Sequence, residues 1–418
     1  MAFGLALALA SACSPARRVN RYMQGQMKAP QLQSQFTGLL LVDAQTGDTL
    51  FAQNALRPFT PASNVKLLTL YAGLKALPER VPVLAYQASG DTLRVWGTGA
   101  PFALHPEWPD STAMQFMQGF ATILMANDHL EDPAHGPGWS WDDFDQYYTP
   151  SRSAFPIYGN TMQAIGTAGG NQIVPPSFRD SIFPDRGRFA REVAANRFYL
   201  NLRPGDTVQV PLLTDPTRER ALWAQALGRE VLPNPTPAPD SLELLYGVPT
   251  DTLYRRMMER SDNFLAEQVM LLVSATLGDT LGFSRARDHA LEHWLADLPQ
   301  TPKWVDGSGL SRYNLISPAS LVALLGKLYR EIPEERLFTL MAKGGGTGTL
   351  RNWYREKPEP YVFGKTGSLS NNHNLSGYLR TRHGKLVLFS FMNNHYLSPT
   401  TGVKERMQHL LDWVWEHY

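Results

Sequence analysis

Three short polar motifs occur in a set order along this chain, and their chemistry requires a fold that brings them together. The first is Ser63-Asn64-Val65-Lys66, the second Ser261-Asp262-Asn263, and the third Lys365-Thr366-Gly367. Taken singly, each is also what a helix cap or a strand end contains. Together they supply a hydroxyl nucleophile, a proton relay and an anion-binding strand, which are the parts of a serine acyl-transfer site. The fold must therefore return the chain to one place twice, across long separations.

The first motif predicts a nucleophile and its base. Positions three apart on a helix share a face, so the Lys66 amine can reach the Ser63 hydroxyl. A free hydroxyl needs a base, and a lysine serves as one when desolvation and nearby cations lower its pKa. The Ser63 N–H, near a helix start, would face the developing oxyanion. A surface Lys beside a Ser cap is the alternative, although Ser-x-x-Lys occurs only once in the chain.

The second motif predicts a proton shuttle to the leaving group at Ser261 and a hydrogen bond to the substrate amide at Asn263. The alternative is a simple helix cap, because Ser, Asp and Asn all favour that position. Ser370-Asn371-Asn372 fits the same pattern. We prefer Ser261 because it lies between the other two motifs and begins a predicted helix.

The third motif predicts a strand that binds an anion. Lys365 adds positive potential, and Thr366 and Ser368 offer hydroxyls to a terminal carboxylate. Gly367 has no side chain, so a substrate can approach its backbone closely. The Ser368 N–H would be a second oxyanion donor, and losing one such donor typically costs roughly 3–4 kcal/mol of transition-state stabilisation.

The apolar patterns predict an α/β (α+β) chain with one mainly antiparallel sheet flanked by helices. Strands are expected at both ends of the chain and helices between them. The expected strands are Phe36–Val42, Thr49–Gln53, Tyr361–Lys365, Leu375–Arg380 and Lys385–Met392, and the expected helices are 63–74, 250–260, 262–277, 283–296, 317–330 and 400–417. Residues 197–202 and 207–213 read as a hairpin across the turn Arg203-Pro204-Gly205-Asp206.

The same patterns predict the domain organisation. A catalytic domain is expected from residues 36–90 and 240–418, with an inserted region at 91–239 that forms one or two small subdomains. Pro recurs at every second position from Pro233 to Pro239 and marks a boundary. The Gly-rich stretch 344–348 lacks the end of a phosphate-binding loop and reads as a turn before a helix.

The first residues predict export. An apolar run over residues 1–12 is too short to span a membrane and resembles a secretory signal at 1–13. Small residues before Cys13, the only cysteine, resemble a lipoprotein signal in which Cys13 is lipidated, and plain cleavage after Ala12 is the alternative. Residues 14–35 are polar and predict a tether. The expected location is periplasmic, with a possible lipid anchor in the membrane.

Charge and composition exclude several classes of function. With 39 basic and 38 acidic residues the net charge is +1, and no basic run predicts a nucleic-acid partner. No His-Glu-x-x-His pattern is present, so neither a metal site nor a cofactor is expected.

Beyond the three motifs, the chain resembles D-alanyl-D-alanine carboxypeptidase/endopeptidases of the penicillin-binding protein 4 type. The resemblance covers most of residues 36–395 and is thin over about 165–240. It includes longer segments around each motif and one more between the second and the third: Pro61–Lys66, Ser261–Gln268, Asp306–Asn314, Gly364–Asn371 and Leu375–Leu379.

The resemblance implies a β-lactamase/transpeptidase-like fold and a penicillin-binding enzyme that trims peptidoglycan stem peptides and cross-links. It implies Ser63 as nucleophile, Lys66 as base, Ser261 and Asn263 as second-motif partners and Lys365 as the third-motif cation. β-Lactam antibiotics would be inhibitors. The segment Gly138–Asp143 resembles one that lines the substrate cleft, including Trp141, and implies that Asp143, or its neighbour Asp142, recognises the free amine of a diamino acid.

Two other functions remain open from the sequence. A serine β-lactamase would share the acylation residues, but the chain lacks the Glu-x-x-Leu-Asn segment that one class of these enzymes uses for deacylation. A catalytically silent, wall-binding lipoprotein would not need the full set of polar residues that the motifs contain. The oligomeric state is not predicted.

Overall fold

The computed structural model describes residues 15–108, 110–184, 187–239, 241–355 and 357–418, so the predicted signal and Cys13 lie outside the described residues. The chain forms two compact units. Unit 1 contains the described residues up to Tyr71, Tyr254–Ser261 and Leu291–Tyr418, and unit 2 contains Ala72–Leu253 and Asp262–Ala290. Within the described residues, no helix combines the length and the apolar character needed to cross a membrane.

Unit 1 is built on a six-stranded antiparallel sheet, as the sequence predicts. N-terminal strands pair with C-terminal ones: β1 lies beside β16, with Phe36 opposite Asn394. In spatial order the strands are β13 (Ala342–Lys343), β14 (Val362–Leu369), β15 (Asn372–Arg380), β16 (Leu386–Asn394), β1 (Phe36–Asp43) and β2 (Thr49–Gln53). Strands β15 and β16 are buried along almost their whole length, and β16 reads as an almost continuous apolar run from Leu386 to Met392.

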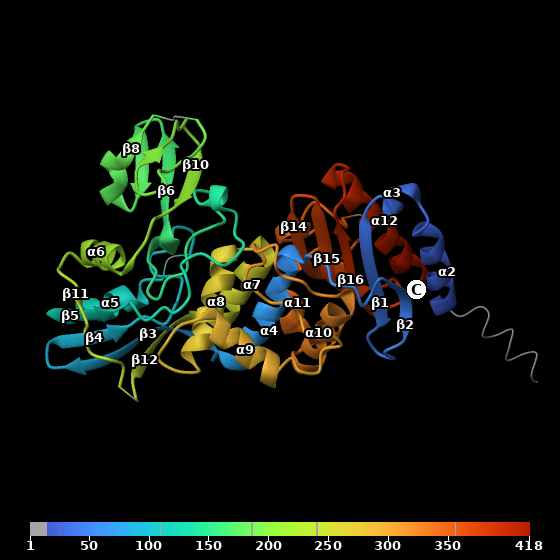
Figure 1. Cartoon of the computed structure of the whole chain (residues 1–418), viewed down its shortest axis with the longest axis horizontal. Coiled ribbons are helices and arrows are strands. Elements are labelled where there is room, and N and C mark those ends of the chain that lie inside the picture. The colour runs from blue at the N-terminus through green and yellow to red at the C-terminus, as the bar shows by residue number, and fades with distance from the viewer. Residues whose placement is uncertain (1–14, 109, 185–186, 240, 356) are drawn as a thin grey trace, which may run out of the picture. The chain divides into compact units, whose positions relative to one another are not determined.

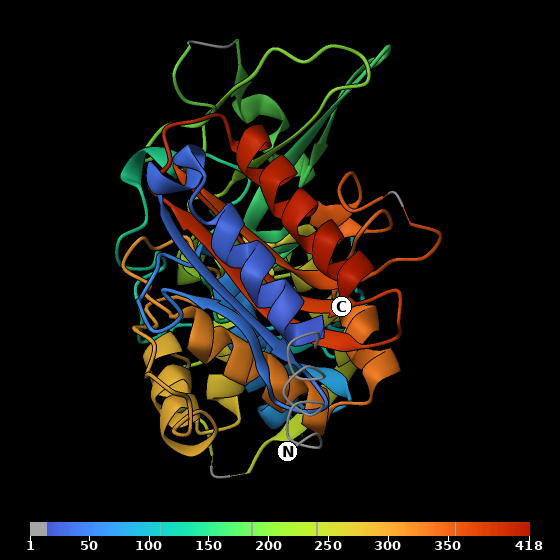
Figure 2. The ribbon, with the colours of Figure 1, turned by 90° about the vertical axis from the view of Figure 1, so that its right-hand side faces the viewer.

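Helices cover both faces of this sheet (Figures 1 and 2). The C-terminal helix α12 (Thr400–His417) buries residues 403, 407, 410, 411 and 414, a spacing that gives one apolar stripe. Helix α10 (Pro318–Glu331) packs on β16 and β1 from the other face. Unit 1 also contains α11 (Glu334–Leu340) and the short 3-10 turns η1 (Ala62–Val65) and η5 (Gly348–Leu350).

The structure differs from the predicted tether at 14–35. Residues Pro15–Gln26 form helix α2, which lies beside α12 on the same face of the sheet (Figure 2), and α3 (Pro30–Gln33) follows. Val19, Met23 and Met27 recur every fourth residue and are buried in the core. Tyr22 stacks on Trp413 with ring centroids 3.8 Å apart. Because the residues between these three positions are mostly polar, the sequence analysis did not identify this apolar stripe.

Unit 2 contains a five-stranded mixed sheet and two smaller sheets. The five strands, in spatial order, are β11 (Leu232–Pro233), β5 (Thr122–Ala126), β4 (Thr92–Trp96), β3 (Arg80–Ser89) and β12 (Glu243–Pro249). The three-stranded sheet is β10 (Thr207–Pro211), β6 (Thr161–Thr167) and β7 (Gly170–Val174), and β8 (Ile182–Phe183) pairs with β9 (Phe198–Tyr199). Its helices are α5 (Thr112–Gln118), α6 (Pro216–Leu227) and α8 (Asn263–Ala275), with 3-10 turns η2 (Trp141–Asp143), η3 (Tyr158–Asn160) and η4 (Pro176–Ser181).

The predicted hairpin of residues 197–202 and 207–213 is wrong. β9 pairs with β8, whereas β10 pairs with β6, so the two segments belong to different sheets. The turn between them is present, and Arg203 N donates to the Asp206 carboxylate. Turn chemistry reports a local reversal of the chain but does not choose the strand partners.

Unit 2 extends beyond the predicted inserted region on both sides. It starts at Ala72 because β3 pairs with both β4 and β12, and it includes helix α8. The chain passes from one unit to the other within α4 (Lys66–Ala76), within α7 (Thr250–Arg260), between Ser261 and Asp262, and within α9 (Phe283–His293). The domain boundaries at 90 and 240 stay a prediction, because a compact unit need not coincide with a domain.

Candidate active site

The first motif forms a tight turn in unit 1 that joins Ser63 to Lys66. Ser63 lies in the 3-10 turn η1, and the α-helix α4 begins at Lys66 itself. The Lys66 Nζ lies 3.0 Å from Ser63 Oγ and also donates to the carbonyl oxygen of Ser308 at 2.6 Å. The Lys66 side chain is fully buried, whereas Ser63 is half-buried and accessible. The Lys66 amine is thus held within hydrogen-bonding distance of the Ser63 hydroxyl.

A buried loop from Asp306 to Asn314 fixes the carbonyl that contacts Lys66. The Asp306 carboxylate accepts hydrogen bonds from Gly309 N, Ser311 N and the Asn314 amide, at 2.7–2.8 Å. Three donors on one buried carboxylate hold the loop in a single shape. The sequence marked this segment as part of the resemblance without a role; its Asp-Gly-Ser-Gly pattern, typical of a tight loop, was the available signal.

The second and third motifs meet in the same unit. Lys365 Nζ donates to Ser261 Oγ at 2.7 Å and to the Thr366 carbonyl at 2.8 Å. Lys365 is fully buried, and burial, together with the charge of Lys66, lowers its pKa well below the usual value. The structure therefore brings Ser63, Lys66, Ser261 and Lys365 together, with two amines each facing one hydroxyl.

The backbone is strained on either side of this arrangement. Ala62 and Ser261 have φ of +48° and +60°, the left-handed region that costs a non-glycine residue roughly 1–2 kcal/mol. Such strain persists only where the surrounding structure imposes it, and it gathers at functional sites. Here it falls on the residue before the nucleophile and on the second-motif serine.

Gly367 is the point where the third motif touches the first. A Cβ added at this position would lie 2.3 Å from the Pro61 carbonyl oxygen and 2.9 Å from the Ser63 nitrogen. Gly309 is similar, since its Cβ would lie 2.0 Å from the Ala62 oxygen. Only glycine allows the strand and the loop to approach the nucleophile turn this closely.

Strand β14 presents the third motif to both of its faces. Lys365 lies in mid-strand, opposite Ser376 of β15, rather than at the strand end that the sequence predicts. Thr366 and Ser368 alternate with Lys365 and Gly367 along the strand, so their side chains point to the opposite face of the sheet. Their hydroxyls have partners: Thr366 donates to Thr349 Oγ1 at 2.7 Å, and Ser368 Oγ shares a 2.7 Å hydrogen bond with His373 Nδ1.

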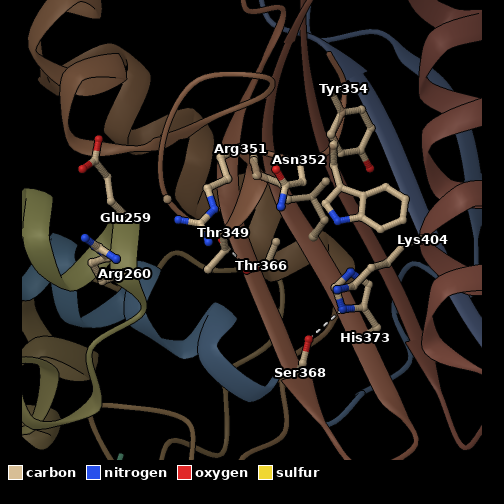
Figure 3. A pocket seen from close by; sticks show the side chains of 14 residues that line it. Glu259, Arg260, Thr349, Arg351, Asn352, Tyr354, Thr366, Ser368, His373 and Lys404 are labelled. Carbon is tan, nitrogen blue, oxygen red and sulfur yellow. Dashed lines mark hydrogen bonds between the residues drawn. The ribbon is translucent and has the colours of Figure 1, made fainter. Parts of the chain in front are cut away.

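Thr366 and Ser368 line a pocket of about 430 Å³ on that face (Figure 3). Its other polar residues include Glu259, Arg260 and Arg351. Burial, with smaller contributions from Lys404 and Lys365, lowers the pKa of His373 to about 3, so this side chain is neutral at physiological pH. Sequence reasoning gave His373 no role and missed the arginines.

The remaining predicted residues belong to unit 2. Asn263 is the first residue of α8, and its amide donates to the Tyr148 carbonyl at 2.9 Å. Burial, followed by the Asp143 carboxylate that hydrogen-bonds to its hydroxyl, raises the pKa of Tyr148 to about 12. Asp142 lies 3.7 Å from Arg188, and Trp141 is 67% exposed. Tyr148, which the sequence did not single out, thus contacts both Asn263 and Asp143.

The rival second motif, Ser370-Asn371-Asn372, forms the turn between β14 and β15. Asn371 takes a φ of +67°, and its amide donates to the Tyr396 carbonyl. These asparagines are explained by the turn, because Asn tolerates the left-handed region better than most residues.

Known proteins resemble this chain over most of its length. The family model "D-Ala-D-Ala carboxypeptidase 3 (S13) family" matches residues 19–177 and 234–414. The chain belongs to this S13 family. The two matched segments leave out residues 178–233, within the stretch where the resemblance is thin.

Individual S13 relatives agree with this assignment. "Carboxypeptidase DacB" of Mycolicibacterium smegmatis is 24% identical over 387 residues, which are 85% of this chain and 75% of that protein. The "D-alanyl-D-alanine carboxypeptidase" of an Actinomadura species is 25% identical over 438 residues, covering 89% and 80%. Each match covers most of this chain, so membership does not rest on short matches.

A solved structure shares the S13 fold. Penicillin-binding protein 4 (DacB) of Haemophilus influenzae superposes with a TM-score of 0.73 at 19% identity, covering 92% of this chain and 97% of that one. A second structure of that protein, complexed with a β-lactam, gives a TM-score of 0.68 at 16% identity and covers 94% and 99%. The predicted family and the β-lactamase/transpeptidase-like fold are confirmed, and the chain is a serine-type D-Ala-D-Ala carboxypeptidase by family.

Proposed function

We propose that Ser63 is the nucleophile of a two-step acyl transfer on the D-Ala-D-Ala ends of peptidoglycan stem peptides. Ser63 Oγ bonds to the carbonyl carbon of the penultimate D-Ala, and Lys66 takes the hydroxyl proton. The C–N bond then breaks, and the amine leaves with a proton relayed through Ser261. Water hydrolyses the resulting ester and regenerates the hydroxyl. The amine belongs to free D-Ala in carboxypeptidase cleavage and to a neighbouring stem peptide in endopeptidase cleavage.

One observation carries the proposal: two buried lysines each contact one motif serine, Lys66 at Ser63 and Lys365 at Ser261. Like charges held in a buried site favour a neutral amine, and a neutral amine can accept the Ser63 proton. The two amines can share one positive charge, so Lys66 is the neutral base in this proposal, and the backbone N–H groups of Ser63 and Ser368 are the expected oxyanion donors. Asn263 would bind the substrate amide.

Labelling with a fluorescent penicillin tests the nucleophile. The wild-type protein should become covalently labelled, and Ser63→Ala should take no label. Ser89→Ala is the control, because Ser89 is an exposed serine of β3 that lies outside the three motifs. An unlabelled wild type would refute the enzyme mechanism and favour a silent wall-binding protein.

The rate of cephalosporin hydrolysis distinguishes a carboxypeptidase from a serine β-lactamase, the alternative that remained open from the sequence. We expect slow hydrolysis of a chromogenic cephalosporin, since the acyl-enzyme formed from a β-lactam should persist. Mass spectrometry of wall fragments after incubation should reveal loss of D-alanine, splitting of cross-links, or both. Fast, sustained cephalosporin hydrolysis without either product would favour the β-lactamase.

We infer that the Asp143 carboxylate recognises the free amine of the stem-peptide diamino acid, with Asp142 as the alternative. Its contact with Tyr148, which also holds Asn263, supports Asp143. Asp142 is engaged by Ser140 and lies near Arg188, which supports a structural role for it. Trp141 is exposed and would pack against the stem peptide.

We propose an exported, periplasmic protein that is lipidated at Cys13. The support comes from the first thirteen residues alone, which lie outside the described part of the chain. Growth with a radiolabelled fatty acid should label the wild type and leave Cys13→Ser unlabelled. Processing of both forms to the same unlabelled product would favour plain cleavage after Ala12.

A further inference from the structure

Unit 2 contains a pocket that the proposed reaction does not use. Its volume of about 550 Å³ lies within the range of small-molecule binding sites, about 300–1,000 Å³. Strands β6 and β10, which lie side by side (Figure 1), supply residues 163 and 207–210 of its lining. Loops supply residues 107, 145–147 and 190. Every lining residue belongs to unit 2, so the shape of this pocket is set within one compact unit.

The strands give the pocket a row of polar side chains. Gln163 of β6 lies directly opposite Gln209 of β10, and residues paired in this way point to the same face of the sheet. Thr207 lies two positions from Gln209 along β10 and therefore shares that face. The Gln209 amide donates to the Glu107 carboxylate at 3.4 Å. Amides, a hydroxyl and a carboxylate together offer both donors and acceptors to a ligand.

A buried carboxylate holds the loops of the pocket in place. Asp145 is only 3% exposed. Its carboxylate accepts hydrogen bonds from the Ala190 nitrogen at 2.5 Å and from the Gln146 amide at 2.9 Å. Both oxygens of Asp145 are thus used within the protein, so this residue fixes the pocket wall instead of binding a ligand.

Tyr147 places an aromatic ring at the pocket. The residue is 68% exposed, and its ring meets that of Tyr148 edge-on with centroids 5.3 Å apart. A tyrosine ring combines a flat apolar surface with a polar hydroxyl, which suits a ligand that is partly apolar and partly wet. The Tyr147 hydroxyl, the Gln163 amide and the Thr207 hydroxyl make no hydrogen bond with any residue that the structure describes.

The charge of the lining favours an uncharged ligand. Among the described residues, those that line the pocket include two carboxylates, Glu107 and Asp145, but no lysine or arginine. Carboxylate-rich peptides and phosphate polymers are therefore disfavoured. A sugar chain fits better, because its hydroxyls match amide and carboxylate groups while the C–H faces of its rings pack on an aromatic ring. Ala190 and Val208 add apolar surface for an acetyl group.

We propose that this pocket, here named the glycan pocket, binds the uncharged N-acetylated sugar chain to which peptidoglycan stem peptides are attached. The inference rests on the proposed function, which brings that polymer to the enzyme, and adds a second, non-covalent contact with it. Tyr147 connects the two contacts. Its ring packs on Tyr148, whose hydroxyl meets Asp143 and whose carbonyl accepts from Asn263, the residues expected to hold the stem peptide.

Calorimetric titration with a tetramer of N-acetylglucosamine tests binding without any catalytic step. The wild type should bind the tetramer. Tyr147→Ala should weaken the affinity about 2- to 10-fold, as expected for one lost neutral contact, and Gln163→Ala/Gln209→Ala should weaken it further. Tyr147→Phe keeps the ring and should recover part of the affinity. Tyr246→Ala is the matched control, because Tyr246 is an exposed tyrosine of unit 2 outside the pocket lining, and it should bind like the wild type.

D-Alanine release shows whether the enzyme uses the glycan pocket. The assay compares a free stem pentapeptide with the same pentapeptide attached to a short glycan chain. The wild type should have the higher kcat/KM on the glycan-linked substrate. Gln163→Ala/Gln209→Ala should reduce that preference while leaving kcat/KM for the free pentapeptide and labelling by penicillin unchanged.

A wild type that is labelled by penicillin but does not bind the tetramer would overturn the inference and leave the proposed function intact. Tetramer binding that Tyr147→Ala and Gln163→Ala/Gln209→Ala leave unchanged would also overturn it, as would binding of spermidine, a cation, in place of the sugar. A wild type that takes no penicillin label would refute the proposed function, and the tetramer titration would then decide the sugar site by itself.

Discussion

At the scale of single residues, the main feature of the site is the burial of two lysine side chains. Lys66 and Lys365 are both fully buried, and each is held by a hydroxyl and a backbone carbonyl. Burial penalises the protonated form of a lysine, which is how an amine becomes a base near neutral pH. The Asp306 loop sets the Ser308 carbonyl that Lys66 contacts, so a residue without a direct part in the chemistry orients the base.

Lys66→Ala should slow acylation by penicillin at least about 100-fold, because general acid–base groups typically contribute that much. Stopped-flow labelling measures the rate. Lys75→Ala, an exposed lysine on the same helix, should react like the wild type. An unchanged rate in Lys66→Ala would refute the base assignment.

His373 predicts a loss of stability in acid. Its pKa is about 3 in the folded protein and about 6.5 in an unfolded chain, so between these values the unfolded state binds more protons. The free energy of unfolding should fall as pH drops from 6.5 toward 3, by at most about 1.4 kcal/mol per pH unit from this group. Urea denaturation at several pH values should give a shallower slope for His373→Gln. Equal slopes would contradict the assignment.

At the scale of elements, strand β14 directs its side chains alternately to the nucleophile turn and to the pocket. Its alternation sends Lys365 and Gly367 to the nucleophile turn and sends Thr366 and Ser368 to the pocket. The loop from Asp306 approaches the same turn from another side through Gly309. The position of Ser63 therefore depends on two backbone approaches that tolerate no side chain.

Gly367→Ala should reduce acylation about 100-fold, because a displacement near 1 Å at the reacting atoms can cost that much. The added Cβ would meet backbone atoms of Pro61 and Ser63, which cannot rotate away. Gly402→Ala is the control, since its Cβ would meet nothing within 4 Å. A Gly367→Ala variant that labels at the wild-type rate would show that the approach is not needed.

At the scale of the whole chain, the N-terminal helix completes the core of unit 1. Helix α2 buries Val19 and Met23 completely, beside α12 at the other end of the chain. The described chain thus joins its two ends over one face of the sheet. A segment that precedes all three motifs contributes to the stability of the scaffold that carries them.

Met23→Ala should lower the free energy of unfolding by about 2–5 kcal/mol, the usual cost of a buried Met→Ala change. Gln24→Ala, at the exposed neighbouring position, should stay within about 0.5 kcal/mol of the wild type. Urea denaturation of both variants measures the difference. A small effect for Met23→Ala would mean that α2 is dispensable, as a tether would be.

The sequence by itself determined the chemistry and most of the sheet. Motif order identified the residues that meet in unit 1, and apolar runs located β1 and β16, because buried strands leave a strong local signal. The family followed from the same residues, and the comparisons confirm it.

Only the tertiary structure decided which distant backbone atoms face each other. The Ser308 carbonyl at Lys66, the arginines behind β14, the core position of α2 and the separate partners of β9 and β10 all depend on contacts between segments far apart in sequence. Local propensity carries no information about such contacts. Every residue has a backbone carbonyl, and the sequence of a polar helix does not show whether another segment packs against it. Their positions follow from packing the whole chain at once.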